Sequence, residues 1–114
     1  MLKFQGKEIE TDQGKFHLPH SILDAEYKDG KVYVVYDYME FPKNAPAHNL
    51  VCLDLQIKQL WVAENPTSLS SDAYTNFARE VDQKPDCIAV YNFAGYLCYI
   101  NQFNGKVLNA IFTK

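Results

Sequence analysis

Residues 32–38 read VYVVYDY, and residues 87–93 read CIAVYNF. Each run is apolar and ends on Val-Tyr, then Asp or its amide, then an aromatic residue. The segments that follow also match, because LVCLDLQIKQLWVA (50–63) aligns with LCYINQFNGKVLNA (97–110). Two matches in the same order predict that one structural unit occurs twice in this chain.

The predicted unit is a meander of four antiparallel strands. Val, Ile, Tyr and Phe dominate both copies and favour pleated, half-buried surfaces. The alignment places Leu50 on Leu97 and Leu53 on Ile100. The first unit, about residues 22–64, is expected to hold strands at 22–28, 31–38, 49–55 and 59–64. The second unit, about residues 74–113, is expected to hold strands at 74–81, 87–93, 96–102 and 106–113.

Turn residues separate most of these strands. Asp29-Gly30 and Asn104-Gly105 are typical of type I′ turns, in which both central residues have positive φ. The segment 84–86 predicts a looser turn, and 56–58 has the weakest signal of the four. Residues 2–10 are expected to add one short strand at an edge.

Segment 74–81, YTNFAREV, is compatible with two structures. Its residues Tyr74, Phe77, Ala78 and Val81 would share one face of a short helix. The repeat favours a strand instead, and we predict a strand.

The predicted fold is all-β. Two four-stranded meanders repeated at about 50 residues are typical of β-propeller blades, and a chain of 114 residues has room for two, a half-propeller. The alternative is a small antiparallel sandwich or barrel. Either arrangement fits a single domain over residues 1–114.

Composition excludes several classes of protein. Hydrophobic residues make up 47% of the chain, which is too many for a disordered protein. The net charge of −3 argues against a general nucleic-acid binder, which needs a basic patch. No apolar run is long enough to span a bilayer, and the N-terminus is too polar for a signal peptide. These features predict a cytoplasmic protein whose three cysteines, Cys52, Cys87 and Cys98, are buried and reduced.

The meander predicts that connections of different length lie at opposite ends. Because successive strands alternate in direction, loops 39–48 and 65–73 should emerge at one end with the N-terminal segment 11–20. The tight turns at 29–30, 56–58 and 104–105 should lie at the other end. Long loops on a rigid scaffold commonly carry function.

The candidate partner-binding residues follow from this arrangement. They combine carboxylates, which suit a cationic partner, with aromatic and amide groups, which suit interface anchors. The set comprises Asp37, Glu40, Phe41, Asn44, His48, Glu64, Asp72 and Tyr74. The N-terminal segment would add Asp12, His17 and His20. Ordinary solvated loops are the alternative interpretation.

Catalytic and metal chemistry have no complete motif in the sequence. Pro19 breaks the helix that would align His17 with His20, and His48 lies near a cysteine, Cys52, that the strand pattern buries. No Ser or Cys has an evident His partner, and the glycines are dispersed at turns. We therefore predict no enzyme activity, no metal and no cofactor.

The repeat and its hairpins, over about residues 22–113, resemble the half-propeller type of immunity protein from contact-dependent growth inhibition. The resemblance implies a small inhibitor that binds a cognate toxin domain one-to-one. The toxin of that type is a ribonuclease of the RNase A superfamily, whose basic active site an acidic surface would cover. The resemblance supplies no position-specific contact residue. The alternative is a propeller-like module that binds a small ligand or joins an assembly, without catalysis.

Overall fold

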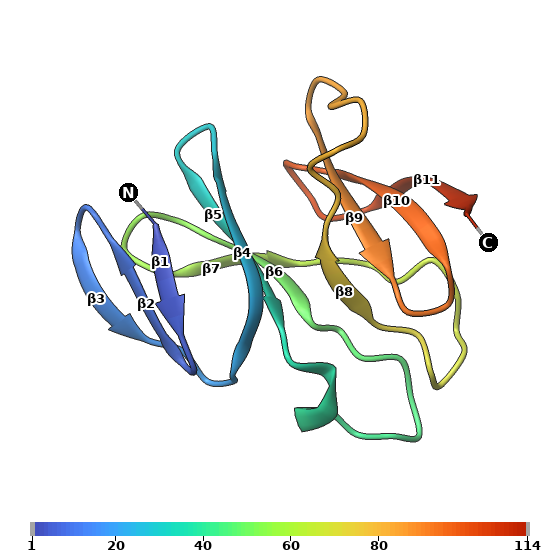
Figure 1. Cartoon of the computed structure of the whole chain (residues 1–114), viewed down its shortest axis with the longest axis horizontal. Helices are drawn as coiled ribbons and strands as arrows, with labels where there is room; N and C mark the ends of the chain where they lie inside the picture. Colours follow the sequence, from blue (N-terminus) through green and yellow to red (C-terminus); the bar gives the residue numbers. More distant parts are fainter. Residues whose placement is uncertain (1, 114) are drawn as a thin grey trace.

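The computed structural model describes residues 2–113, which form three antiparallel sheets side by side (Figure 1). The N-terminal sheet contains β1 (Lys3–Gln5), β2 (Glu8–Thr11) and β3 (Gly14–His17). The central sheet contains β4 (Ile22–Lys28), β5 (Lys31–Tyr36), β6 (Leu50–Leu53) and β7 (Gln59–Val62). The C-terminal sheet contains β8 (Tyr74–Phe77), β9 (Cys87–Asn92), β10 (Tyr96–Asn101) and β11 (Val107–Phe112). No helix in this part of the chain could span a membrane.

The central and C-terminal sheets confirm the predicted half-propeller. Each sheet is a four-stranded meander in chain order, β4-β5-β6-β7 and β8-β9-β10-β11. The first strands of the two sheets, β4 and β8, lie against each other as the inner strands of adjacent blades do. Asp24 joins them: its carboxylate accepts the Phe77 N–H at 2.9 Å and a two-pronged bond from Arg79 at 2.9 and 3.0 Å.

Both faces of the central sheet are buried, which explains the unbroken apolar run in β5. Tyr33 and Val35 point into the core between the central and C-terminal sheets. Val32, Val34 and Tyr36 point into the core between the N-terminal and central sheets. Adjacent residues of a strand face opposite sides, so burial on both sides needs apolar residues in succession.

The residue-by-residue alignment of the two units was wrong by one position. Val35 pairs with Leu50 on β6, and the equivalent Val90 pairs with Cys98 on β10. Leu50 therefore corresponds to Cys98, whereas the alignment placed it on Leu97. A strand that is apolar on both faces has no polar alternation to set its register, and a slip of one residue exchanges the faces.

The N-terminal region forms a whole three-stranded sheet, where one short strand and a loop were expected. Ile9 on β2 is fully buried in the core against the central sheet, and Phe16 on β3 packs at its border. β2 and β3 each contribute one apolar residue to the core and β1 contributes none, which is too few to produce a readable alternation. The expected placement of Asp12 was also wrong, because Asp12 lies beside Leu55 near the tight turns.

One of the two predicted type I′ turns is confirmed, and the other differs from expectation. Asp29 (φ 51°) and Gly30 (φ 77°) have the two positive φ angles of the predicted type I′ turn. At 104–105 only Gly105 has a positive φ, and its N–H bonds Asn101 O at 2.8 Å, so this connection is a wider loop.

The strand predicted at 74–81 is confirmed as a strand, but it ends at Phe77. Residues 79–86, here called the strap, instead fold over the outer face of the C-terminal sheet. The Tyr99 hydroxyl donates to Asp82 O at 3.1 Å, and Lys84 Nζ lies 4.4 Å from the centre of the Tyr99 ring. The strap thus covers one end of the stack of sheets, as the N-terminal sheet covers the other.

Candidate functional site

The long connection 78–86 lies at the end that carries the tight turns, where only a turn over 84–86 was expected, and the Gln102 N–H donates to Asp86 O at 3.0 Å. Connections 39–48 and 65–73 lie together at the other end, as predicted. Residues 37–48, 65–73 and 93–95 form this end, here called the loop face, and the first two segments follow the lower edge of Figure 1. The Ala47 N–H donates to Asp72 O at 2.8 Å, and Asn65 Nδ2 donates to Ala47 O at 3.0 Å. The first two connections are therefore bonded directly to each other.

Asn49 ties the loop face to both sheets from inside. Its side chain is fully buried, and Nδ2 donates to Tyr36 O at 2.9 Å and Tyr74 O at 2.8 Å. Its Oδ1 accepts the Tyr74 N–H at 3.0 Å. One amide thus satisfies three buried backbone groups where the two meanders meet, which is why a polar residue is stable at this position.

Asp72 acts as a second internal tie. It was expected on the exposed surface, but it is fully buried. Its Oδ2 accepts the Thr67 N–H at 2.9 Å and the Thr67 hydroxyl at 2.7 Å, and its Oδ1 accepts from Asn92 Nδ2. Asn92 in turn accepts the Tyr96 N–H, so Asp72 connects segment 65–73 to the turn at 93–95.

The first connection is shaped by a short 3-10 turn, η1 (Tyr38–Glu40). Asp37 Oδ1 caps it by accepting the Met39 N–H at 2.9 Å. Glu40 Oε1 accepts the Ser21 N–H at 3.1 Å and lies 3.4 Å from His20 Nδ1. The bond from Ser21 lowers the pKa of the Glu40 carboxyl, so Glu40 stays ionised near neutral pH.

A pocket of about 170 Å³ opens between these segments. Its walls are mainly apolar and come from all three connections: Tyr38, Met39, Pro42, Ala45, Ala47, Ala73 and Phe93, with Lys43, Ser70, Ser71 and Asp72. The rings of Tyr38 and Phe93 lie 5.7 Å apart. Met39 is 62% exposed and Phe93 is 54% exposed, so two large apolar side chains at the rim of this pocket are open to solvent.

The candidate residues occupy three kinds of position. Asp37, Glu40, Phe41, Asn44 and His48 lie on the loop face, where Phe41 packs its ring 4.6 Å from His20. Tyr74 is buried, and its hydroxyl donates to Glu64 O at 2.6 Å. The Glu64 side chain accepts the Val107 N–H, at the start of β11. Asp72, Tyr74 and Glu64 therefore support the fold.

Sequence reasoning missed the exposed apolar residues of the loop face. Leu69 (57% exposed) is the one large apolar residue of segment 65–73, and that isolation was the available signal. Met39 lies between Tyr38 and Glu40, close to Phe41, and has no such signal. Phe93 was assigned to a strand, although β9 ends one residue earlier.

Titratable and metal-binding groups are dispersed. Among residues 2–113 no three His, Cys, Asp or Glu side chains lie close enough to hold a metal ion. The three cysteines are free and buried, as predicted. Burial raises the pKa of the Cys52 thiol to about 11 and that of Cys98 to about 12, so both are protonated near neutral pH.

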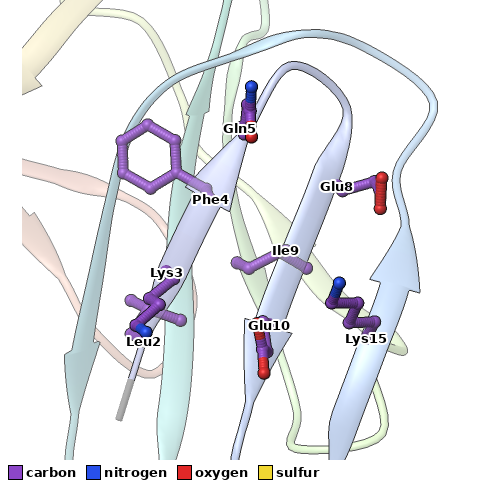
Figure 2. Close-up of a pocket in the computed structure, with 8 residues that line it drawn as sticks. All are labelled: Leu2, Lys3, Phe4, Gln5, Glu8, Ile9, Glu10 and Lys15. Atoms are coloured by element: carbon purple, nitrogen blue, oxygen red, sulfur yellow. The ribbon is translucent and has the colours of Figure 1, made fainter.

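A larger hollow lies elsewhere, on the N-terminal sheet. It measures about 510 Å³ and is bordered by Lys3, Glu10 and Lys15, which Figure 2 shows in a row across the three strands. Glu10 lies directly opposite a base on each side, so the row carries two bases and one acid. The walls of the loop-face pocket are instead mainly apolar.

The chain matches the family described as a domain of unknown function (DUF7957) over residues 1–112, and it belongs to that family. No curated protein matches the chain.

Proposed function

We propose that this member of the DUF7957 family is a binding protein that neutralises a toxic enzyme by docking its loop face onto the enzyme's catalytic domain. The resemblance to half-propeller immunity proteins suggests the class of target, a ribonuclease domain bound one-to-one in the cytoplasm. The role requires no catalysis and no cofactor from this chain. The loop face supplies the features on which the proposal depends.

The observation that carries the proposal is the convergence of exposed apolar groups from three separate connections. Met39, Leu69 and Phe93 are each more than half exposed. Large apolar and aromatic side chains beside a pocket are the usual anchors of protein interfaces. Keeping them in solvent costs free energy in the unbound chain, and burial against a partner recovers it.

The loop face is also prepared for binding before the partner arrives. Buried bonds from Asn49 and Asp72 hold the connections in place. A surface that is already ordered loses less conformational entropy on docking than a flexible one. High affinity is thus compatible with an interface of ordinary size, about 1,200–2,000 Å².

Charged groups of the loop face contribute less to the proposed binding than its apolar groups do. Asp37 and Glu40 are its carboxylates within 37–48, and Lys43 offsets one of them, its Nζ lying 3.3 Å from Met39 Sδ. We propose that Glu40 meets a basic group at the rim of the ribonuclease cleft while the apolar anchors supply most of the affinity. Added salt should then slow association modestly and leave dissociation almost unchanged.

The proposal expects the catalytic domain of a toxin to be encoded beside this gene, and the experiment uses that domain as an inactive variant. Binding is measured by calorimetry for the natural chain and for Phe93→Asp and Phe103→Asp. Phe103 is the matched control, because it is 60% exposed at the opposite end. We expect Phe93→Asp to weaken binding about 30-fold or more, as loss of an interface anchor does, and Phe103→Asp to leave it unchanged.

Two outcomes would overturn the proposal. The neighbouring catalytic domain could fail to bind the natural chain, or the two substitutions could weaken binding equally. Co-expression gives a second measurement: the natural chain should restore growth to cells that make the active enzyme, and Phe93→Asp should not.

A further inference from the structure

The outer edge of the C-terminal sheet is an open strand beyond its first residue, Val107, whose N–H donates to Glu64 Oε1 at 2.9 Å. β11 pairs with β10 on one side, and no strand within residues 2–113 pairs with its other side. Between Lys106 and Lys114 the sequence has no charged residue, no Pro and no Gly. Edge strands normally carry such residues because unpaired backbone groups otherwise recruit another strand.

The other outer edges differ from β11. β1 carries Lys3 and β3 carries Lys15. β4 carries three charged residues and lies against β8. β7 is uncharged but has only four residues, against six for β11. The longest uncharged outer edge is therefore β11.

Exposed apolar side chains line both faces of this edge. Ile111 is 43% exposed beside Leu97, its partner on β10, on the outer face of the sheet. Phe112 is 58% exposed on the other face, where its ring lies 5.4 Å from the Tyr96 ring. Leu108, at a bulge, is 57% exposed. A strand added to β11 would bury apolar surface on both faces as well as pairing the backbone.

The pairing of β11 with β10 determines which backbone groups of β11 are available. The Thr113 N–H points toward β10, since it donates to Gly95 O at 2.8 Å. Backbone N–H groups alternate in direction along a strand, so those of Phe112 and Ala110 point away from β10. When β11 pairs antiparallel with a second β11, residues whose N–H groups point outward face one another. A two-fold axis beside Ala110 meets this condition, because it places Ala110 opposite Ala110 of the other strand. Leu108 then faces Phe112 of the other strand, and Asn109 faces Ile111.

We propose that β11 pairs antiparallel with β11 of a second copy about this axis, which creates one continuous eight-stranded sheet. Among residues 107–113 no charge opposes another in this register, and a small side chain, Ala110, lies at the two-fold axis. The two-fold axis sends the loop faces to opposite ends of the dimer. Each copy can therefore still bind its own partner one-to-one.

The experiment measures the mass of the chain in solution by light scattering and sedimentation over a wide concentration range. We expect a reversible dimer of twice 13.1 kDa. Ala110→Pro removes an outward N–H without touching the pairing to β10, so the variant should stay folded and become monomeric. Ile111→Lys should weaken the dimer about tenfold or more, because the substitution occurs twice per interface.

Leu60→Lys on β7 is the matched control, since Leu60 is 45% exposed on the other outer edge. It should leave the dimer intact. Circular dichroism verifies that each variant is folded. A natural chain that stays monomeric at every concentration, or a dimer that survives Ala110→Pro, would overturn the proposal.

Discussion

The two ends of the molecule expose similar aromatic side chains in different settings. At the loop face, Phe93 lies beside Tyr38 and a pocket to which three connections contribute. At the opposite end, which carries the turns at 29–30 and 102–105 and is here called the turn end, Phe103 protrudes from a loop with Lys31 Nζ 6.0 Å from its ring. Exposure alone does not mark a binding surface. The arrangement of neighbouring groups distinguishes the two ends, and buried polar residues hold that arrangement at the loop face.

The largest expected effect concerns Asn49. Asn49→Ala leaves two buried carbonyls and one buried N–H without partners, so we expect a loss of about 3–4 kcal/mol in the free energy of unfolding. Gln102→Ala is the control at the turn end, where the side chain donates one bond, to Asp29 Oδ2 at 3.1 Å, and should cost about 1 kcal/mol. Urea unfolding measures both. Equal losses in the free energy of unfolding would contradict the view that the buried bonds of Asn49 hold the loop face in place.

Gly105→Ala examines the rigidity of the turn end. A Cβ at this position would lie 2.6 Å from Trp61 Cε3, in addition to the strain of a positive φ. We expect a loss of about 2–3 kcal/mol in stability. Gly30→Ala has the same φ of 77° with open space around it, so it should cost only about 1–2 kcal/mol. Thermal unfolding followed by the fluorescence of Trp61 compares them, and equal shifts would argue against close packing on Trp61.

Two buried tyrosines extend the comparison into the core. The Tyr74 hydroxyl, near the loop face, donates to Glu64 O, whereas the Tyr33 hydroxyl has no hydrogen-bonding oxygen or nitrogen partner. Tyr74→Phe should therefore cost about 1 kcal/mol of stability, and Tyr33→Phe should be neutral or slightly stabilising. Denaturant unfolding of the two variants measures both changes in the free energy of unfolding. The account would be wrong if Tyr33→Phe proved the more damaging.

The smallest effect is a pH dependence at the loop face. The Ser21 N–H lowers the pKa of Glu40 in the folded state, so the carboxylate stabilises this contact above the unfolded pKa. That contribution is lost as pH falls through the lower, folded value. The Ser21 amide resonance should move with this titration and stop moving in Glu40→Gln. If the Ser21 resonance moved with pH in Glu40→Gln as it does in the natural chain, Glu40 would not be the cause, and the prediction would be contradicted.

Some of this architecture could be predicted from the sequence, because it depends on local patterns. The apolar runs around Val35 and Val90 indicated buried strands, and Asp29-Gly30 indicated its turn. The predicted alignment of segment 50–63 with 97–110 was wrong by one residue, because the strands in these segments are apolar on both faces. The N-terminal sheet was not predicted, because Ile9 is the one fully buried residue among its strands and leaves no readable pattern.

The individual site residues were harder to predict than the end of the fold on which they lie. Asp72 is buried because Thr67 and Asn92 supply its bonds, and a sequence does not show which partners will meet. Tyr74 was chosen for its aromatic ring, which the core uses. The exposed Met39 and Phe93 were overlooked because apolar residues are normally assigned to the interior.

Hydrogen exchange on the complex tests the central claim most directly. The chain is compared with and without an inactive variant of the catalytic domain that the proposed function expects beside its gene, with backbone amides measured along the whole sequence. We predict added protection at 38–43, 68–73 and 93–95, and none at 29–31 and 102–105. Protection confined to the turn end, with unchanged exchange at the loop face, would contradict the assignment of the loop face as the binding surface.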